Sequence, residues 1–364
     1  MRAVRSWKIF LRWLLATLIY YGRLPFLWRV GGRRRQPIVL AYHRILNPMQ
    51  VRDRILPGMY VRPRTFEKHL RYLKRHYRVV TMREFLSGYR ESGMNHRPLC
   101  AITFDDGWDD NYSNALPALR SHQLPATLFV STDFIDTGGT PWFYHLSCLL
   151  ERIATRPRAG GAMGQFADCS RFPRPLRDWL QAPPDRQRQG IYPLIDALKR
   201  ESGDTLNAIL RSLDRLLPPA ESGACSPPRA MLTWTQLREM ASSRIEIGSH
   251  GCSHMILGRI PPAAVQAEVT ESKRSLESQL RHTVEGFSYP NGDHSDRIRS
   301  LVRTAGYTYA CSLDPGPVLP DDLPYQVKRI LVHEDITFTT AMFACHIEGI
   351  FRRTSRSDPQ SHLD

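Results

Sequence analysis

The sequence contains no close pair of cysteines and no long apolar run near its start. Its seven cysteines are odd in number and scattered along 364 residues, so a disulfide framework is not expected and a reducing compartment is favoured. We interpret most of them as small buried apolar side chains. The longest uncharged stretch near the N-terminus, residues 13–22, has ten residues, whereas a membrane-spanning helix needs about 20.

Acidic residues are absent from the first tenth of the chain. Residues 1–35 carry nine Lys or Arg and no Asp or Glu, and they hold most of the net charge of +15. Because Trp, Leu and Tyr are interleaved with these basic residues, the segment suits an anionic membrane surface better than nucleic acid, which we do not expect as a partner. A spanning anchor, a cleaved signal peptide and a buried helix are the alternatives, although no small-residue cleavage site follows the apolar stretch. Cysteine usage favours the cytoplasmic side of the membrane, and an exported, anchored protein is the alternative.

The rest of the chain predicts an α/β domain with no internal repeat. Hydrophobic residues make up 42% of the sequence, which is enough for a large core and excludes global disorder. Apolar, strand-like segments alternate with amphipathic helical ones, which indicates a mostly parallel sheet or barrel. We expect strands at 37–43, 99–104, 126–130, 244–248, 284–289, 308–311 and 327–332. We expect the intervening helices at 65–77, 82–89, 112–122, 235–242, 263–281, 295–305 and 339–351.

The middle of the chain interrupts this alternation. Residues 138–230 contain Gly-Gly and Pro-Pro pairs and helical pieces near 146–153 and 191–216, but no clear strand. We therefore predict a mostly helical insertion at 138–230 that divides a catalytic domain into 36–136 and 231–351. The polar residues 352–364 are expected to form a flexible tail.

Two clusters of side chains that could bind a metal or act as a base each follow a predicted strand. Asp105 and Asp106 are adjacent in Thr-Phe-Asp-Asp-Gly (103–107), and His250 and His254 follow the strand at 244–248. Loops at the carboxyl ends of parallel strands meet at one mouth. Two His at i and i+4 lie on one face of a helical turn, and with one carboxylate they form a frequent ligand set for a hydrolytic metal. Adjacent carboxylates allow one to bind the metal and the other to act as a base. Either cluster alone is more simply a solvated turn or a surface His pair.

Together these motifs resemble the polysaccharide deacetylase family, also called the NodB-homology domain or carbohydrate esterase family 4. The match is closest to its bacterial exopolysaccharide-associated branch. The resemblance implies a distorted (β/α)7-type barrel in which Asp105 is the catalytic base and Asp106, His250 and His254 hold a divalent metal, most often zinc. It also implies a carbohydrate substrate, with hydrolysis of the N-acetyl group of N-acetylhexosamine residues in a polysaccharide or lipid-linked glycan.

The third family motif, Arg-x-Pro-Tyr, departs from the pattern. Residues 288–291 read Ser-Tyr-Pro-Asn, so the arginine that orients the catalytic Asp is missing, while the backbone N–H at Asn291 still serves as an oxyanion donor. His333 matches the family's general acid in Leu-x-His, and His43 is a second candidate. The missing arginine keeps open a catalytically weakened, membrane-associated glycan-binding or assembly protein; a metal hydrolase with another ester or amide substrate is a third hypothesis. The sequence leaves the sugar and the oligomeric state open.

Overall fold

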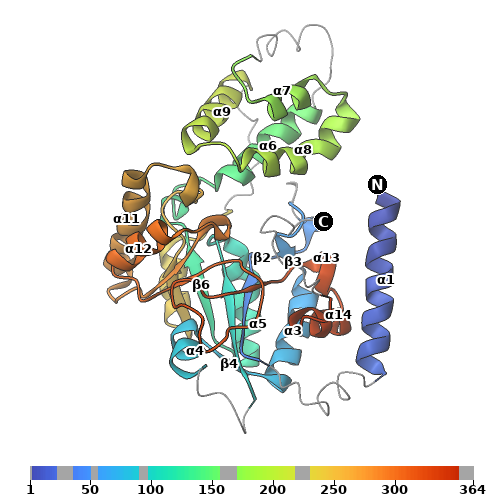
Figure 1. Ribbon diagram of the computed structural model, residues 1–364, viewed down its shortest axis with the longest axis vertical. Coiled ribbons are helices and arrows are strands. Elements are labelled where there is room, and N and C mark those ends of the chain that lie inside the picture. The colour runs from blue at the N-terminus through green and yellow to red at the C-terminus, as the bar shows by residue number, and fades with distance from the viewer. Residues whose placement is uncertain are drawn as a thin grey trace.

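The fold is given by a computed structural model that describes residues 2–22, 36–50, 56–89, 97–155, 170–217 and 230–351. A barrel-like domain carries a helical layer at one end, and helix α1 stands along its side (Figure 1). The predicted tail at 352–364 and the basic residues 23–35 lie outside the described residues.

A parallel sheet forms the centre of the larger domain. Its strands run in the order β10-β1-β5-β6-β7-β8-β9. Strand β4 lies outside this order: it pairs with the first half of β5, and β6 pairs with the second half of β5 along the same edge. This curved parallel sheet with helices around it confirms the predicted distorted barrel. The bounds are β1 (Ile38–Tyr42), β4 (Arg78–Val80), β5 (Leu99–Phe104), β6 (Ala126–Val130), β7 (Ile245–Ser249), β8 (Gly286–Ser288), β9 (Tyr309–Cys311) and β10 (Ile330–Leu331).

Strands β1, β5 and β6 are buried at every residue. Their mostly apolar sequences, without alternation of apolar and polar residues, are typical of parallel strands that helices cover on both faces. The last predicted strand, 327–332, is shorter than expected. Val327 forms a single parallel bridge with Cys311, and only Ile330 and Leu331 pair with β1. The segment from Val327 to Leu331 thus joins the two ends of the sheet.

Helices surround the sheet near the predicted positions. In α3 (Pro63–His76) the buried face contains Phe66, Leu70 and Leu73, which have the i, i+4, i+7 spacing that predicted this helix. The helix expected from residue 112 instead begins with a π-helical turn, η2 (Asn111–Ala115), before α5 (Leu116–His122). The others are α4 (Met82–Gly88), α10 (Trp234–Ala241), α11 (Pro262–Leu280), α12 (Asp296–Thr304), α13 (Glu334–Thr337) and α14 (Thr340–Ile347). Short elements are β2 (Arg44–Ile45), which pairs with β3 (Tyr60–Val61), and the 3-10 turns η1 (Pro48–Gln50), η3 (Thr132–Phe134), η5 (Leu257–Arg259) and η6 (Pro290–Gly292).

The helical insertion contains α6 (Trp142–Thr155), α7 (Arg174–Gln181), α8 (Pro184–Leu198) and α9 (Gly203–Leu216). These helices share an apolar core that extends to Trp108 of the barrel. The sequence did not predict α7, and the single helical piece expected at 191–216 is two helices. The break is explained by Ser202, whose side chain accepts a hydrogen bond from the N–H of Thr205 and so begins a new helix.

Helix α1 (Arg2–Tyr21) lies beside α14 (Figure 1). Ala16 is fully buried in a small cluster with residues of α14. The opposite face is apolar but exposed, with Trp7 59%, Leu18 60% and Tyr21 70% exposed. No helix in the described part of the chain has the length and apolarity needed to cross a membrane.

Candidate active site

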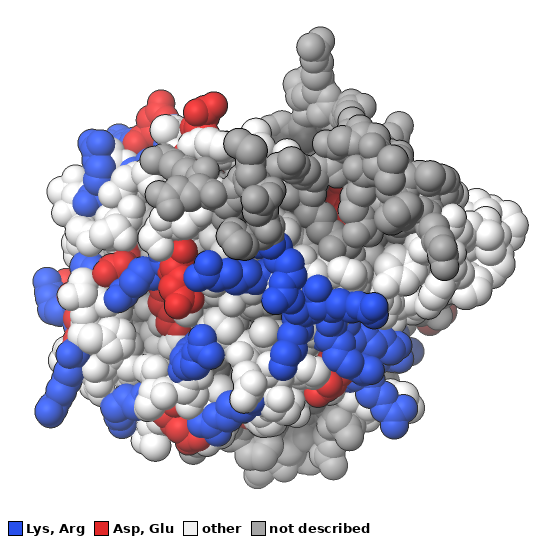
Figure 2. Space-filling view, turned by 90° about the horizontal axis from the view of Figure 1, so that it is seen from below, with Lys and Arg blue, Asp and Glu red and all other residues white. Residues whose placement is uncertain are grey.

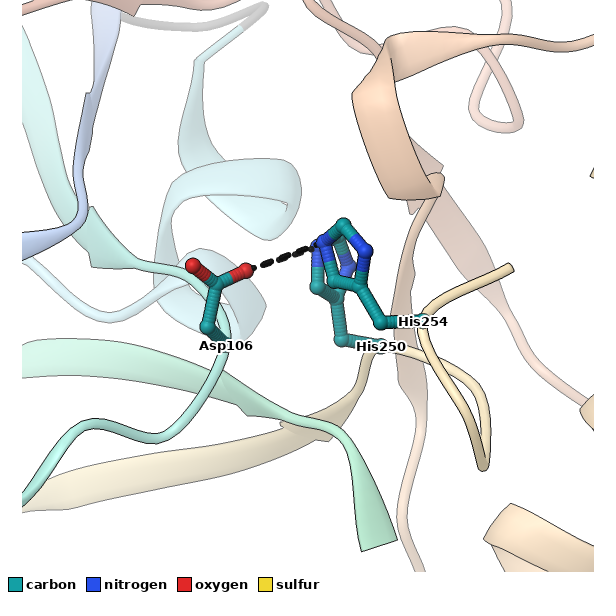
Figure 3. Close-up of side chains that lie close together, drawn as sticks. All are labelled: Asp106, His250 and His254. Atoms are coloured by element: carbon teal, nitrogen blue, oxygen red, sulfur yellow. Dashed lines mark ion pairs between the residues drawn. The ribbon is translucent and has the colours of Figure 1, made fainter. Parts of the chain in front are cut away.

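The structure brings Asp106, which follows β5, together with His250 and His254, which follow β7 (Figure 3). The potential ligand atoms of these three buried residues all lie within 4.8 Å of one another. Oδ1 of Asp106 is 3.1 Å from Nε2 of His254 and 3.5 Å from Nε2 of His250. The three side chains predicted as metal ligands therefore converge on one point at the carboxyl end of the sheet.

Backbone geometry turns the Asp106 carboxylate toward the histidines. Asp106 and Gly107 have φ values of +77° and +91°, in the left-handed region that only glycine adopts without strain. A Cβ at Gly107 would lie 3.1 Å from Cγ1 of Val130. The Asp-Asp-Gly sequence thus requires glycine at position 107 to close the turn after β5.

The two histidines do not lie on a helical turn, so that part of the prediction was wrong. Gly251 and His254 have φ values of +79° and +57°, which are incompatible with a right-handed helix. An irregular loop instead brings the imidazoles together, with ring centroids 4.9 Å apart. The i, i+4 spacing predicted their proximity correctly but the backbone path incorrectly.

Glu268 of α11 holds this histidine loop in place. Its carboxylate accepts hydrogen bonds from the N–H groups of Cys252 at 2.7 Å and Ser253 at 3.0 Å, and also from the Ser253 hydroxyl. The Cys252 thiol points to the carbonyl of Glu268 rather than to the histidines. Sequence reasoning missed Glu268, because its distance along the chain gives no local signal.

The surroundings of the three side chains suit a metal ion. Nδ1 of His250 bonds the carbonyl oxygen of Ser288 at 2.7 Å, which leaves Nε2 as the ligand atom. Oδ2 of Asp106 accepts a hydrogen bond from Nε1 of Trp108 at 2.7 Å, whereas Oδ1 is buried without a hydrogen-bond partner among the described residues. Burial raises the pKa of Asp106, but His250 and His254 outweigh it and hold this pKa well below its usual range. An ionised oxygen between two imidazole nitrogens fits zinc or a similar cation.

Asp105 faces a different partner, Arg329. The guanidinium binds both carboxylate oxygens, Nη1 to Oδ1 and Nη2 to Oδ2, each at 2.8 Å, and both side chains are almost fully buried. Arg329 also donates to the Ser288 hydroxyl at 2.8 Å and to the carbonyl of Ser312 at 2.9 Å. Burial raises the pKa of Asp105, but the charge of Arg329 more than offsets this and the net shift is downward.

Arg329 therefore places a guanidinium on Asp105, although residues 288–291 lack the arginine of the third family motif. It lies between the bridge at Val327 and β10, far along the chain from Ser288. An arginine inside a predicted buried strand was the available signal, because a buried guanidinium requires a partner of opposite charge.

Two histidines remain as candidate general acids. His43 follows β1 and is partly buried; its Nδ1 atom is buried and has no hydrogen-bond partner among the described residues. Burial lowers the pKa of His43, although the negative charges of Asp106 and Asp105 act to raise it. His333 stands at the N-terminus of α13, with Nδ1 3.9 Å from Oδ2 of Asp335. Asn291, the predicted oxyanion donor, lies in η6 after β8 with φ of +58°. The roles of all three stay predictions.

Comparison with known proteins agrees with this geometry. The sequence profile described as polysaccharide deacetylase matches residues 92–163 and 198–310. A poly-beta-1,6-N-acetyl-D-glucosamine N-deacetylase of Staphylococcus aureus is 26% identical over 271 residues, which cover 74% of this chain and 67% of the relative. The fold is similar to the Streptococcus pyogenes deacetylase PplD in complex with acetate, with a TM-score of 0.54, 17% identity and coverage of 86% of this chain and 99% of that chain. It is also similar to IcaB from Ammonifex degensii, with a TM-score of 0.52, 19% identity and coverage of 86% and 98%. The chain belongs to the polysaccharide deacetylase family.

Proposed function

We propose that this protein is a metal-dependent hydrolase that removes the N-acetyl group from N-acetylhexosamine residues of a polysaccharide or lipid-linked glycan. The observation that carries the proposal is the convergence of Asp106, His250 and His254 beside an Asp105 carboxylate fixed by Arg329. The name of the Staphylococcus aureus relative favours a poly-N-acetylglucosamine as the first substrate to test.

Each residue has a defined task in this proposal. Oδ1 of Asp106 and Nε2 of both histidines hold the cation, for which zinc is the best fit to the ligand set. When bound, the cation would polarise the acetyl carbonyl and lower the pKa of the attacking water. Asp105 accepts the proton of that water, and Arg329 fixes the direction of its carboxylate.

The remaining tasks fall on the other predicted residues. The backbone N–H of Asn291 donates a hydrogen bond to the oxygen that gains negative charge. His333 or His43 donates a proton to the departing amine. Replacing each of these two histidines by Asn distinguishes them, because loss of the acid lowers kcat without lowering metal content.

Arg329 also bears on the competing hypothesis of a catalytically weakened glycan-binding or assembly protein. That hypothesis depended on the absent arginine of the third motif, and a guanidinium is present at the carboxylate of Asp105. It therefore loses its main support.

Acetate release from a panel of N-acetylhexosamine oligomers, with and without a chelator, tests the proposal. We expect chelator-sensitive release that Asp105→Asn nearly abolishes while metal content is kept. A metal-free protein that releases no acetate would favour the glycan-binding alternative. A metal-loaded protein that releases none would indicate another ester or amide substrate.

We further propose that α1 attaches the enzyme to an anionic membrane surface, on the cytoplasmic side. The large exposed apolar side chains of α1 support this: Trp7, Phe10, Leu11, Leu14, Leu15, Leu18 and Tyr21. Figure 2 shows Lys and Arg gathered in a band on the face seen from below, the end of the molecule at which α1 also ends in Figure 1. Lys74, Arg75 and Arg78 are exposed basic residues at the junction of α3 and β4. Apolar and basic surfaces together suit a membrane of anionic lipids.

Co-sedimentation of the full chain with anionic and neutral vesicles tests this attachment. Leu18→Glu, which places a charge on the exposed face of α1, should strongly reduce binding to anionic vesicles. Leu323→Glu is the matched control, because Leu323 is similarly exposed, at 57%, but lies outside α1. Equal binding by both variants would contradict the role of α1. Protease protection in intact cells would distinguish the cytoplasmic side from an exported, anchored form.

A further inference from the structure

The indole of Trp108 connects the candidate metal centre to the helical insertion. Its Nε1–H donates a hydrogen bond of 2.7 Å to Oδ2 of Asp106, and the side chain is completely buried. This bond occupies the oxygen that does not face the histidines. Oδ1 is left directed at His254 and His250, at 3.1 and 3.5 Å.

The orientation of the indole is fixed by neighbours from two parts of the chain. Tyr144 of α6 contacts the ring edge-on, with centroids 5.1 Å apart. The guanidinium of Arg44 lies over the ring, 4.3 Å from its centroid, and its Nε donates to Oδ2 of Asp110 at 2.8 Å. Both members of that ion pair are buried. The indole N–H therefore has one direction available.

The backbone leaving the insertion is attached to the same loop. Trp108 forms an antiparallel bridge with Met231, and the N–H of Leu232 donates to the carbonyl of Gly107 at 3.0 Å. Tyr144 lies near the start of the insertion and Met231 just after its end. Both ends of the insertion thus act on the short loop that carries Asp106.

We infer that Trp108 is a positioning residue for the metal-binding carboxylate, and that the helical insertion sets metal affinity through it. A hydrogen bond to a ligating group fixes its direction, and loss of such a bond typically weakens metal binding about 10–100-fold. The inference rests on the metal site of the proposed function but not on its substrate.

A pair of matched Trp→Phe substitutions in the full-length protein tests it. Trp108→Phe keeps most of the ring but removes the donor to Asp106. Trp142→Phe removes the same atoms from the same apolar cluster, and Nε1 of Trp142 is buried without a hydrogen-bond partner among the described residues. Zinc affinity is measured by competition with a chromophoric chelator, and thermal melting checks folding.

We expect Trp108→Phe to weaken zinc binding about 10–100-fold, with kcat at saturating zinc reduced much less, and Trp142→Phe to leave zinc affinity unchanged. Tyr144→Leu, which loosens the ring without touching the hydrogen bond, should weaken zinc binding to an intermediate degree and carries the test if Trp108→Phe does not fold. Equal zinc affinities in the wild type and Trp108→Phe, or equal losses of affinity in both Trp→Phe variants, would overturn this inference but leave the proposed function standing. A wild-type protein that binds no zinc would overturn the metal site and the proposed function with it.

Discussion

The ion pair between Arg329 and Asp105 makes the sharpest prediction. Arg329→Met removes the guanidinium but keeps much of the volume of the side chain. It leaves Asp105, which is 1% exposed, without its charged partner in the protein interior. Breaking a buried pair on one side costs about 3–5 kcal/mol, because the remaining charge is neither solvated nor neutralised. We expect a loss of that order in the free energy of unfolding and a loss of nearly all acetate release.

A double-mutant cycle separates the pair from its surroundings. The variants are Arg329→Met, Asp105→Asn and both together, each unfolded in urea and followed by circular dichroism. Because the double variant contains no unpaired buried charge, we expect it to be more stable than Arg329→Met alone. The coupling energy should be several times the value of about 0–1 kcal/mol that is typical of exposed pairs.

Arg329→Lys distinguishes charge from geometry. Lysine keeps the positive charge but cannot bind both carboxylate oxygens through a planar fork. We expect Arg329→Lys to recover part of the stability and little of kcat, because lysine does not fix the direction of the Asp105 carboxylate. Additive effects in the cycle, or Arg329→Met with wild-type stability and activity, would refute the assignment of Arg329 as the group that holds the base.

Four further predictions test other parts of the structure. His254→Ala should lower zinc content in the purified protein, and unchanged stoichiometry would remove it from the ligand set. Gly107→Ala should destabilise the fold by about 1–2 kcal/mol in urea unfolding, because a Cβ is strained at φ of +91° and meets Val130 at 3.1 Å. Ser288→Ala removes the hydroxyl that bonds Arg329 but not the carbonyl that bonds His250, so kcat should fall while zinc affinity is unchanged. Burial lowers the pKa of His69 to about 3 from 6.5. Between these two pH values the unfolded state binds a proton that the folded state does not. The free energy of unfolding therefore falls as the pH falls, by up to about 1.4 kcal/mol per pH unit. His69→Gln should flatten that part of the stability profile, and an unchanged slope would show that His69 does not cause it.

The sequence predicted best those elements whose burial is complete. Apolar runs identified β1, β5 and β6, since parallel strands covered on both faces have no polar alternation. The two clusters of candidate ligands were predicted because each follows a predicted strand, and the carboxyl ends of parallel strands meet. The path of the histidine loop was not predicted, since i, i+4 spacing suits a helix and the positive φ at Gly251 is a property of the folded backbone.

The sequence also did not predict the residues from distant segments that contact the site. Arg329 and Glu268 contact the site through side chains whose direction depends on the register of the sheet and the docking of α11. The absence of the family arginine from residues 288–291 therefore kept open the hypothesis of a catalytically weakened protein. A one-dimensional motif records which residue usually supplies a group, whereas catalysis requires only that the group be present in space.

The order of strands explains why the two acids are adjacent in the chain. The N–H of Asp105 continues the ladder to β1 by bonding the carbonyl of Tyr42 at 3.0 Å, while the carbonyl of Asp106 accepts from the N–H of Ser131, after β6, at 3.2 Å. Beyond β1 lies β10, which follows Arg329, and beyond β6 lies β7, which precedes the histidines. Asp105 still pairs with β1 and its carboxylate binds Arg329, whereas the left-handed turn at Asp106, with φ of +77°, directs the next carboxylate to His250 and His254. The adjacent acids therefore reach different partners because one continues the pairing with β1 and the other lies in the turn that leads toward β6.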